Sequence, residues 1–310
     1  MKEENKKIKL PLGQVNLDYE LGIYYIDMRP AIVHYTSNFY DGKMDDKGVP
    51  MIGTKEGLQY SPINIAQYGL MLHADWLENK NIKTLEVLKN CLSILDKTKT
   101  INDDTCAWFH NYVEVRYNIA PPWASAMAQG ELISFYLRMY QVLNDENLLN
   151  TAIKAYNFLK IDVKNGGVRK YDEDGNLWFE EYPSSPSSYV LNGFIYTIFG
   201  LYDLYRVSKD SIVKDDINAC ILTLKNNLHK FDSGYWSNYD LLKKELVRYY
   251  YQKNVHVPQL EILYILTGES IFEKYKIKWE NNINPFNYFL VKVMYRIRPR
   301  IQKLKKIFNI

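Results

Sequence analysis

The strongest chemical signal in the sequence is a short acidic and aromatic segment, Trp178–Pro183. It places Glu180 and Glu181 side by side between aromatic residues, and Pro183 and Pro186 restrict the backbone that follows. Neighbouring side chains of an extended segment point to opposite sides, so one glutamate should enter a cleft while the other faces solvent or a cation. Taken alone, such a pair is more often structural than catalytic.

Other catalytic signatures are absent. The sequence contains no glycine-rich phosphate loop, no His-Glu-x-x-His motif and no Gly-x-Ser-x-Gly motif, and its five histidines are scattered. Cys91, Cys106 and Cys220 are widely spaced, which predicts neither a disulfide framework nor a structural zinc site. We therefore expect no metal and no cofactor, and any catalysis should rest on carboxylates and tyrosine hydroxyls.

Composition predicts a folded protein, because 47% of its 310 residues are hydrophobic and 24% are charged. The net charge of +3 is too small to indicate nucleic-acid binding. Tyrosine is in excess, with 27 residues against 12 phenylalanines. Either a cleft packs sugar faces against tyrosine rings, or tyrosine replaces phenylalanine under an AT-biased base composition. The Lys-rich segment Met1–Leu12 has no apolar run, so we expect no signal peptide and a cytoplasmic location.

The periodicity of apolar residues changes at Pro62. Residues 1–60 lack a helical period and are expected to form an extended N-terminal arm with short strands. Helices are expected at 62–77, 82–95, 121–143, 148–159, 188–207, 212–229, 257–266 and 271–279. Turn signals predict a β-hairpin within 164–181, and Ser187 or Ser188 is the expected N-cap of the helix that follows it. The predicted fold is mainly α: an incomplete (α/α) toroid or barrel over 61–284, with β-hairpins at its cleft.

Two of these helices carry apolar residues around nearly their whole circumference. In 190–204 the polar row is Asn192, Tyr196 and Asp203, and in 123–139 it includes Ser125 and Gln129. As inner helices of a toroid they would point these rows into the central cleft. The alternative is a polar row whose hydrogen bonds are satisfied inside the core.

Several sequence blocks resemble the C-terminal catalytic domain of D-glucuronyl C5-epimerases. They occur in the family's order across 60–280. The blocks are YSPINIAQYGL (60–70), WASAMAQG (123–130), WFEEYPSSPSSYVLNGF (178–194), GLYDL (200–204), SNYDL (237–241) and, more weakly, HVPQL (256–260). The resemblance implies conversion of D-glucuronate to L-iduronate within a heparosan-like polysaccharide.

This reaction removes the proton alpha to the uronate carboxylate and returns one from the opposite face. The resemblance implies that Glu181 is one acid/base, with Tyr182 beside it. Tyr239 and Tyr251 would serve the opposite face, with Tyr250 as the second choice for Tyr251. Trp123 and Trp178 are either sugar-stacking platforms or core residues.

Substrate binding is less well defined, because the arginine that often follows Tyr-Asp-Leu in the family is replaced here by Leu242 and Lys243. Arg116, Lys243 or Arg248 would bind the uronate carboxylate, although an ammonium does not replace a bidentate guanidinium unchanged. The residues expected to contact the rest of the sugar chain are Tyr60, Gln67, Gln129, Asn192 and His256.

The C-terminal segment 285–310 combines basic and apolar residues and contains no acidic residue. It is too short and too charged to span a bilayer. It is expected to contact an anionic membrane surface or polysaccharide-synthesis machinery, to hold an acidic glycan, or to be a solvated end. A homodimer is left open. The alternatives to an epimerase are an (α/α)-toroid lyase or hydrolase acting on uronate glycans, and a non-catalytic glycan-binding protein.

Overall fold

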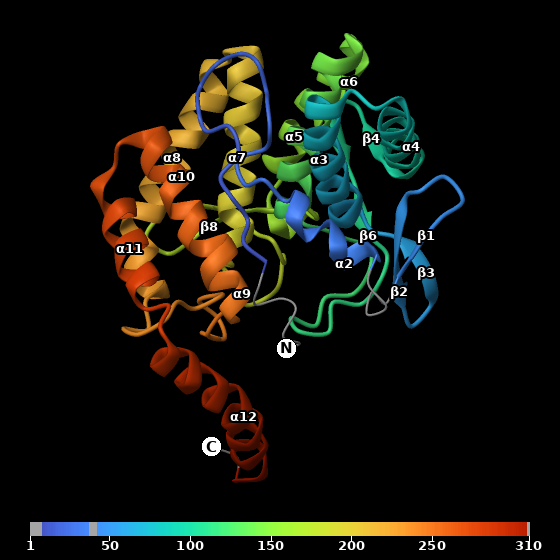
Figure 1. Cartoon of the computed structure of the whole chain (residues 1–310). Helices are drawn as coiled ribbons and strands as arrows, with labels where there is room; N and C mark the ends of the chain where they lie inside the picture. Colours follow the sequence, from blue (N-terminus) through green and yellow to red (C-terminus); the bar gives the residue numbers. More distant parts are fainter. Residues whose placement is uncertain (1–7, 37–41, 309–310) are drawn as a thin grey trace.

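Paired α-helices form most of the protein (Figure 1). The computed structural model describes residues 8–36 and 42–308, and side chains as far as Ile297. The paired helices are α3 (Pro62–Asn79) and α4 (Ile82–Thr98), α5 (Ala126–Leu143) and α6 (Glu146–Leu159), α7 (Leu191–Ser208) and α8 (Ser211–Asn227), and α10 (Val257–Thr267) and α11 (Ser270–Asn281). Helix α5 packs against both α3 and α7, so the first helices of these pairs lie inside the others. The predicted incomplete (α/α) toroid is confirmed.

The two helices of each pair are joined by one kind of tight turn. The first helix ends at a residue with left-handed backbone, and the next residue is the N-cap of the second helix. The left-handed residues are Lys80, Asn144, Lys209 and Gly268. In three of the pairs an Asn or Asp side chain then accepts a hydrogen bond from the second helix, as Asp210 does from Ile212 N at 2.8 Å.

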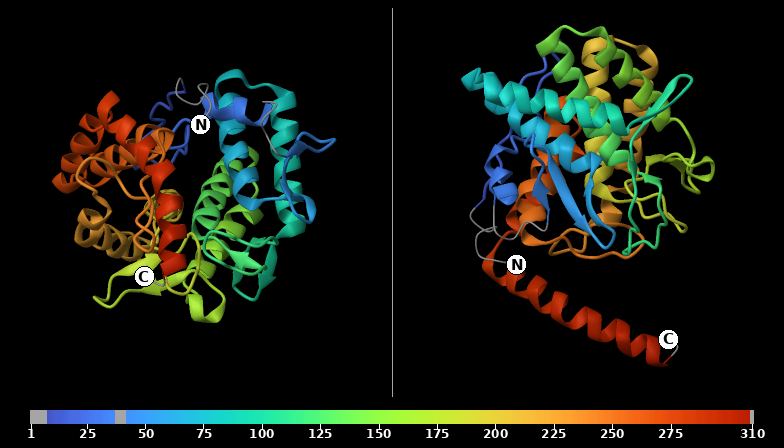
Figure 2. Two further views of the ribbon diagram at one scale, coloured as in Figure 1. Left: turned by 90° about the horizontal axis from the view of Figure 1, so that it is seen from below. Right: turned by 90° about the vertical axis from the view of Figure 1, so that its right-hand side faces the viewer.

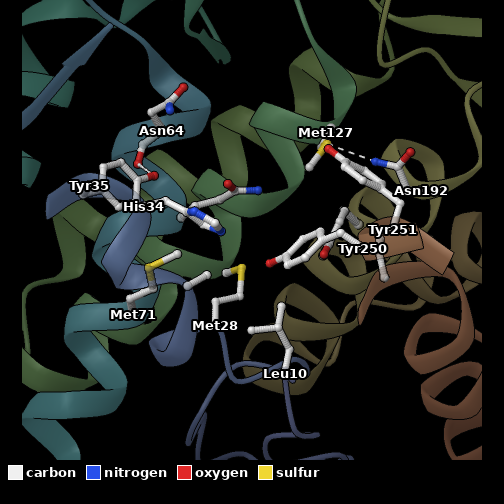
Figure 3. A pocket seen from close by; sticks show the side chains of 14 residues that line it. Leu10, Met28, His34, Tyr35, Asn64, Met71, Met127, Asn192, Tyr250 and Tyr251 are labelled. Carbon is white, nitrogen blue, oxygen red and sulfur yellow. Dashed lines mark hydrogen bonds between the residues drawn. The ribbon is translucent and has the colours of Figure 1, made fainter. Parts of the chain in front are cut away.

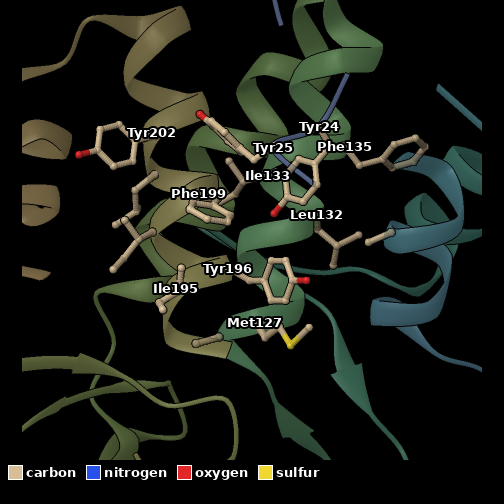
Figure 4. Packing of buried hydrophobic residues seen from close by; sticks show 14 of the residues in the cluster. Tyr24, Tyr25, Met127, Leu132, Ile133, Phe135, Ile195, Tyr196, Phe199 and Tyr202 are labelled. Carbon is tan, nitrogen blue, oxygen red and sulfur yellow. The ribbon is translucent and has the colours of Figure 1, made fainter. Parts of the chain in front are cut away.

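The inner helices α5 and α7 are in direct backbone contact. A Cβ added at Gly200 would lie 2.3 Å from the carbonyl oxygen of Gly130, so neither helix could hold a larger side chain there. Figure 4 shows the rings and branched chains that fill the space beside this contact, including Ile133 of α5 and Phe199 of α7. Both helices are buried along nearly their whole length, as the sequence predicts.

The polar row of α7 behaves differently from the prediction at Asp203. This residue is fully buried and forms ion pairs with Arg138 (2.6 Å) and Arg206 (3.2 Å), both also fully buried. The arginines also donate to carbonyl oxygens of the N-terminal segment, Arg138 Nε to Gly22 O and Arg206 Nη2 to Glu20 O. Asp203 therefore does not reach the cleft, because its charge is used to neutralise two arginines that anchor the chain's first segment.

The N-terminal region packs against the toroid. Its elements are the 3-10 helix η1 (Arg29–Ile32), the short helix α2 (Val33–Thr36) and an antiparallel sheet of β1 (Lys43–Met44), β2 (Pro50–Thr54) and β3 (Gly57–Tyr60). The short strands agree with the prediction, whereas the helical turns at 29–36 were not predicted. Leu10 N donates to Asn254 Oδ1 at 3.0 Å, and η1 packs against α3. The segment thus bridges α3 and the last helix pair.

Small antiparallel hairpins connect the helix pairs: β4 (Thr100–Asn102) with β5 (Thr105–Ala107), β6 (Phe109–His110) with β7 (Trp123–Ala124), and β8 (Arg169–Tyr171) with β9 (Leu177–Phe179). The last of these is the hairpin predicted within 164–181. The helix predicted from 121 begins only at Ala126, because Trp123 pairs with His110 and Ser125 is the N-cap.

The helix predicted from residue 188 begins at Leu191. Its N-cap is Val190, which makes no side-chain capping bond. The predicted cap, Ser188, instead donates its hydroxyl to Glu180. This correction matters for the site described below.

The C-terminal third contains the 3-10 turn η3 (Leu228–Phe231), a single helical turn α9 (Tyr249–Tyr251), and a π-helical segment η4 (Gln252–His256) that leads into α10. The last helix, α12 (Pro285–Phe308), crosses beneath the body and extends away from it (Figure 2). Within the described residues, no helix combines the length and the apolar character needed to cross a bilayer.

Candidate active site

Glu181 lies two residues beyond β9, with its carboxyl group pressed against α7. A Cβ at Gly193 would come within 2.1 Å of Glu181 Oε2, so only glycine leaves room for the carboxyl group there. The Tyr239 hydroxyl donates to Glu181 Oε1 at 3.0 Å. In the described part of the chain, Oε2 is buried and has no hydrogen-bond partner. One carboxylate oxygen is therefore held by a tyrosine while the other remains unsatisfied.

Burial raises the pKa of Glu181 to about 7, although hydrogen bonding by Tyr182 and Tyr239 and the positive charge of Arg116 act in the opposite direction. A carboxyl group that is partly ionised near neutral pH can both accept and return a proton. The site thus holds a group whose protonation suits acid/base chemistry.

Glu180 is also buried, with 1% of its surface exposed against 5% for Glu181. Its Oε2 accepts hydrogen bonds from Ser188 Oγ (2.8 Å) and Tyr189 N (3.1 Å). The prediction that one glutamate faces solvent or a cation is therefore wrong. The loop that follows folds back and supplies Glu180 with neutral donors, so both side chains are enclosed by protein.

A cavity of about 350 Å³ lies beside Glu181 and collects several of the predicted site residues. Its polar lining is Arg116, Tyr182, Tyr239, Glu245, Arg248 and Tyr251. The loop that carries Tyr239 is attached to the start of α7, because Leu191 N donates to Tyr239 O at 3.1 Å. The same backbone contact therefore positions Tyr239 relative to the glutamate that follows β9.

The three candidate cations differ in their surroundings. Arg116 is held by Glu245 (2.6 Å) and Asp240 (3.3 Å), and its guanidinium lies 4.4 Å from the centre of the Tyr239 ring. Lys243 Nζ donates to the carbonyl oxygen of Arg116 and lies outside the cavity lining. Arg248 is exposed at the cavity, and no ion pair joins it to an acidic side chain among the described residues.

A second cavity, of about 310 Å³, lies on the other side of Tyr251, which lines both cavities. Gln67 and Asn192 line it, so two more predicted residues meet here. In Figure 3, His34 and Tyr35 lie on one side of this cavity and Tyr250 and Tyr251 on the other. Tyr251 therefore lines both spaces, whereas Tyr250 lines only the second.

Three predicted binding residues lie elsewhere. Tyr60 lines a different cavity, of about 420 Å³, and its hydroxyl donates to Asp45 at 2.8 Å. Gln129 is fully buried and donates to the carbonyl oxygen of Trp108 at 2.9 Å. His256 is fully buried, with Nδ1 at 2.8 Å from Ser237 Oγ. Gln129 and His256 join elements of the core, and none of the three lines the cavities at Tyr251.

The two predicted tryptophan platforms are core residues. Trp178 is buried and donates its indole N–H to Asp172 at 3.0 Å, and Trp123 is buried and stacked on His110. Neither ring lines the cavities that contain Tyr251. For both residues the core alternative holds.

Sequence reasoning missed two residues near the site. The Tyr117 ring stacks on Tyr182 with 4.8 Å between centroids, and its hydroxyl donates to Asp240 at 3.0 Å. Glu131 is fully buried in α5; Gln67 Nε2 donates to its Oε1 at 3.3 Å, and burial raises its pKa well above the ordinary range. A carboxylate in the middle of an otherwise apolar inner helix was a usable signal for Glu131, whereas nothing distinguished Tyr117 among 27 tyrosines.

Metal-binding side chains do not gather in the described part of the chain, where no cluster of His, Cys, Asp and Glu could hold an ion. All three cysteines are buried and unpaired. The titratable groups that line the two cavities at Tyr251 are the carboxyl group of Glu245, several tyrosine phenols, the guanidinium groups of Arg116 and Arg248, and the imidazole of His34.

Comparisons with known proteins identify the family of the chain. The family model described as D-glucuronyl C5-epimerase C-terminus matches residues 102–281. The chain is 36% identical over 179 residues to the D-glucuronyl C5-epimerase of Caenorhabditis elegans, which covers 52% of this chain and 29% of that protein. It is 31% identical over 175 residues to an uncharacterized protein of Methanocaldococcus jannaschii, covering 56% of each. The chain therefore matches less than two thirds of the length of either relative.

Among solved structures, a GH76 alpha-mannanase of Bacteroides thetaiotaomicron superposes with a TM-score of 0.51 at 13% sequence identity, covering 78% of this chain and 63% of that one. This likeness concerns the toroid fold alone. The family match extends over more than half of the chain and includes both Glu181 and the tyrosine loops. The chain belongs to the D-glucuronyl C5-epimerase C-terminal family.

Proposed function

We propose that this protein is a uronyl C5-epimerase that acts on D-glucuronate residues within a polysaccharide. The observation that carries the proposal is the hydrogen-bonded pair of Glu181 and Tyr239 beside a cavity that also contains Arg248 and Tyr251. This is a base, a set of proton donors and a cation in one space, which is what C5 inversion of a uronate requires.

Glu181 is the proposed base. With a pKa of about 7 a substantial fraction is ionised at neutral pH, and this carboxylate can remove the C5 proton of a glucuronate residue. The negative charge that develops on the uronate carboxyl group needs hydrogen-bond donors or cations to stabilise it.

Tyr251 is the proposed acid on the opposite face. Tyr239 was expected to share this role, but its hydroxyl is 3.0 Å from Glu181 and no sugar ring fits between the two groups. Tyr239 would therefore lie on the same face of the sugar ring as Glu181. Burial raises the pKa of Tyr251 to about 12, so its phenol is protonated at neutral pH and can donate to C5. The Tyr239 and Tyr251 rings meet edge to face, with 6.2 Å between centroids.

The proton balance closes over one turnover. Glu181 gains the proton from C5 and Tyr251 loses one to C5, so the enzyme is left with a carboxylic acid and a phenolate. The charge of Arg248 lowers the pKa of Tyr251 and so stabilises this phenolate. Exchange with solvent restores both groups. In the reverse direction the phenolate is the base and the protonated carboxyl group is the acid.

Arg248 is the proposed ligand of the uronate carboxylate. The guanidinium of Arg116 is already engaged by Glu245 and Asp240 and covers the Tyr239 ring, so its contribution is to hold Tyr239 in place. A guanidinium can bind a carboxylate through two parallel hydrogen bonds, and Arg248 is exposed at the cavity.

The test is incubation of the protein with heparosan, and separately with unsulfated chondroitin, in deuterated water. The expected result is deuterium at C5 and new iduronate signals in the NMR spectrum, with polymer length unchanged. Unsaturated uronate ends would reassign the protein as a lyase, and new reducing ends without them would reassign it as a hydrolase. Binding of both polymers without exchange would leave a glycan-binding protein.

A further inference from the structure

Helix α12 is attached to the body by one face. Val291 is only 2% exposed and packs in a small apolar cluster with Trp236 and Val247. The Tyr295 hydroxyl donates to Leu246 O, and the Tyr288 ring lies 4.7 Å from that of Tyr249. Residues 288, 291 and 295 are three and four positions apart and therefore lie on the same side of the helix.

The opposite side of α12 carries an apolar stripe that the body leaves uncovered. At about 100° per residue, positions 286, 289, 290, 293 and 297 fall within an arc of about 100° that faces away from Val291. Phe286 is 69% exposed, Phe289 61% and Ile297 40%. In the sequence the same spacing continues through Ile301, Leu304 and Phe308. Exposed phenylalanines aligned along one face indicate that something covers this stripe in the working protein.

Positive charge is concentrated on the same segment. Residues 285–310 contain no acidic residue and seven basic ones, which are Lys292, Arg296, Arg298, Arg300, Lys303, Lys305 and Lys306. The whole chain has 39 basic and 36 acidic residues, so the remainder of the chain carries more acidic than basic residues. The net positive charge of the protein therefore comes from this segment.

We propose that α12 binds an anionic lipid bilayer, lying in the plane of its surface. The apolar stripe would enter the boundary between head groups and acyl chains, while the lysines and arginines contact lipid phosphates. A second copy of α12 is a poor occupant, because pairing two stripes would bring basic segments together with no acidic residue to offset their repulsion. An anionic surface matches both features of the helix at once.

The proposed surface lies close to the candidate active site. Tyr295 of α12 lines the cavity of about 350 Å³ that also contains Arg248 and Tyr251. Seen from below, α12 lies across the underside of the body (Figure 2). A bilayer held by the outer side of α12 would therefore lie next to the cavity, and a polymer emerging at that bilayer would meet the site without leaving the surface.

The test is sedimentation of the full chain with vesicles of phosphatidylcholine containing phosphatidylglycerol, and with phosphatidylcholine alone. We expect binding to the anionic vesicles that weakens with added salt. Phe286→Ser/Phe289→Ser should lower the partition coefficient at least about tenfold. Ile82→Ser/Leu222→Ser removes two exposed apolar side chains from the body and should leave it unchanged.

The charges are tested by Lys292→Glu/Arg296→Glu against Lys83→Glu/Lys89→Glu, which makes the same change on the exposed side of α4. The α12 variant, Lys292→Glu/Arg296→Glu, should bind anionic vesicles about tenfold more weakly. The α4 variant should bind like the original chain. The proposal is overturned if the original chain does not sediment with anionic vesicles, or if the tail and body variants lose binding equally. It is also overturned if the phenylalanine variant abolishes self-association in the absence of lipid while vesicle binding persists. None of these readouts depends on epimerase activity.

Discussion

The surroundings of Glu180 and Glu181 differ, although the two residues are neighbours in the chain and burial raises the pKa of each to about 7. Glu180 is bound by donors of its own loop, Ser188 and Tyr189. Glu181 is bound by Tyr239, which comes from a distant loop and lines a cavity. A raised pKa therefore does not by itself identify the catalytic carboxylate. Each glutamate keeps one buried oxygen without a hydrogen-bond partner among the described residues, so the distinguishing feature is the contact between Glu181 and a tyrosine that lines a cavity.

Replacing each glutamate in turn gives the largest contrast. Glu181→Gln should slow C5 deuterium exchange about 10³-fold, because the amide cannot accept the proton. Glu180→Gln keeps an oxygen acceptor for its two donors and should stay within about threefold of the original rate. Exchange is measured by NMR on heparosan, with folding checked by circular dichroism. Comparable losses in both variants would contradict the assignment of Glu181 as the base.

Stability should depend on pH in the same way for both residues. Each pKa is raised from 4.5 to about 7, so between these values the folded protein holds protons that the unfolded chain has lost. Each of these two carboxyl groups should therefore lower the free energy of unfolding by up to about 3 kcal/mol as pH rises from about 4.5 to 7, with no further change above that range. Buried Glu131 adds to this decline, whereas the lowered pKa values of the buried His73, His110 and His256 act in the opposite direction. Urea unfolding at several pH values measures this.

Each single Gln variant should remove the decline that its own carboxyl group contributes, which is measured as the difference in free energy of unfolding between the variant and the original chain at each pH. The two variants would then show a similar change in stability, whereas only Glu181→Gln would show a large loss of activity. A decline that persists undiminished in both variants would show that other groups cause it.

Removing the hydroxyl of Tyr239 should alter the pKa of Glu181 and leave Glu180 unaffected. Its hydrogen bond lowers the pKa of Glu181, so Tyr239→Phe should raise that pKa and move the acid limb of the kcat/KM profile to higher pH. At pH 7 we expect a loss of about tenfold. Tyr189→Phe is the matched control, because Tyr189 contacts Glu180 through its backbone N–H. An unchanged pH profile in Tyr239→Phe would show that Tyr239 does not set the pKa of Glu181.

The smallest effect is expected at Ser188. Ser188→Ala removes the 2.8 Å hydrogen bond to Glu180 and should lower the free energy of unfolding by about 1 kcal/mol. Exchange activity should remain within about twofold. Ser211→Ala, at an exposed position, controls for loss of a hydroxyl. A large loss of activity in Ser188→Ala would mean that Glu180 also takes part in the reaction.

Much of the fold follows from the sequence because the inner helices are apolar on nearly all sides and the pairs are separated by clear turns. The positions that could not be predicted are those where a contact with a residue distant in the sequence overrides the local preference for a helix or a helix cap. Trp123 joins a two-residue strand rather than a helix, since His110 pairs with it. Ser188 does not cap α7, because a buried glutamate eight residues earlier in the chain takes its hydroxyl.

The candidate site was predictable to the extent that a family resemblance brings Glu181, Tyr182, Tyr239 and Tyr251 into one list. In the structure the three tyrosines line one cavity, and Tyr239 donates a hydrogen bond to Glu181. The resemblance could not separate residues that line a cavity from residues that join helices. Gln67 and Gln129 look alike in sequence, yet one faces a cavity and the other donates to a core carbonyl oxygen. That difference depends on which neighbour lies opposite, which the sequence does not state.

The close approach of α5 and α7 at Gly130 and Gly200 limits how this protein can move. Two helices whose backbones touch cannot slide or rotate past one another without collision, because no flexible side chain lies between them to adjust. They form a rigid frame, and Glu181 is fastened to it through Gly193. We therefore expect motion at the candidate site in α9 and α12, which lie outside this frame, rather than at Glu181.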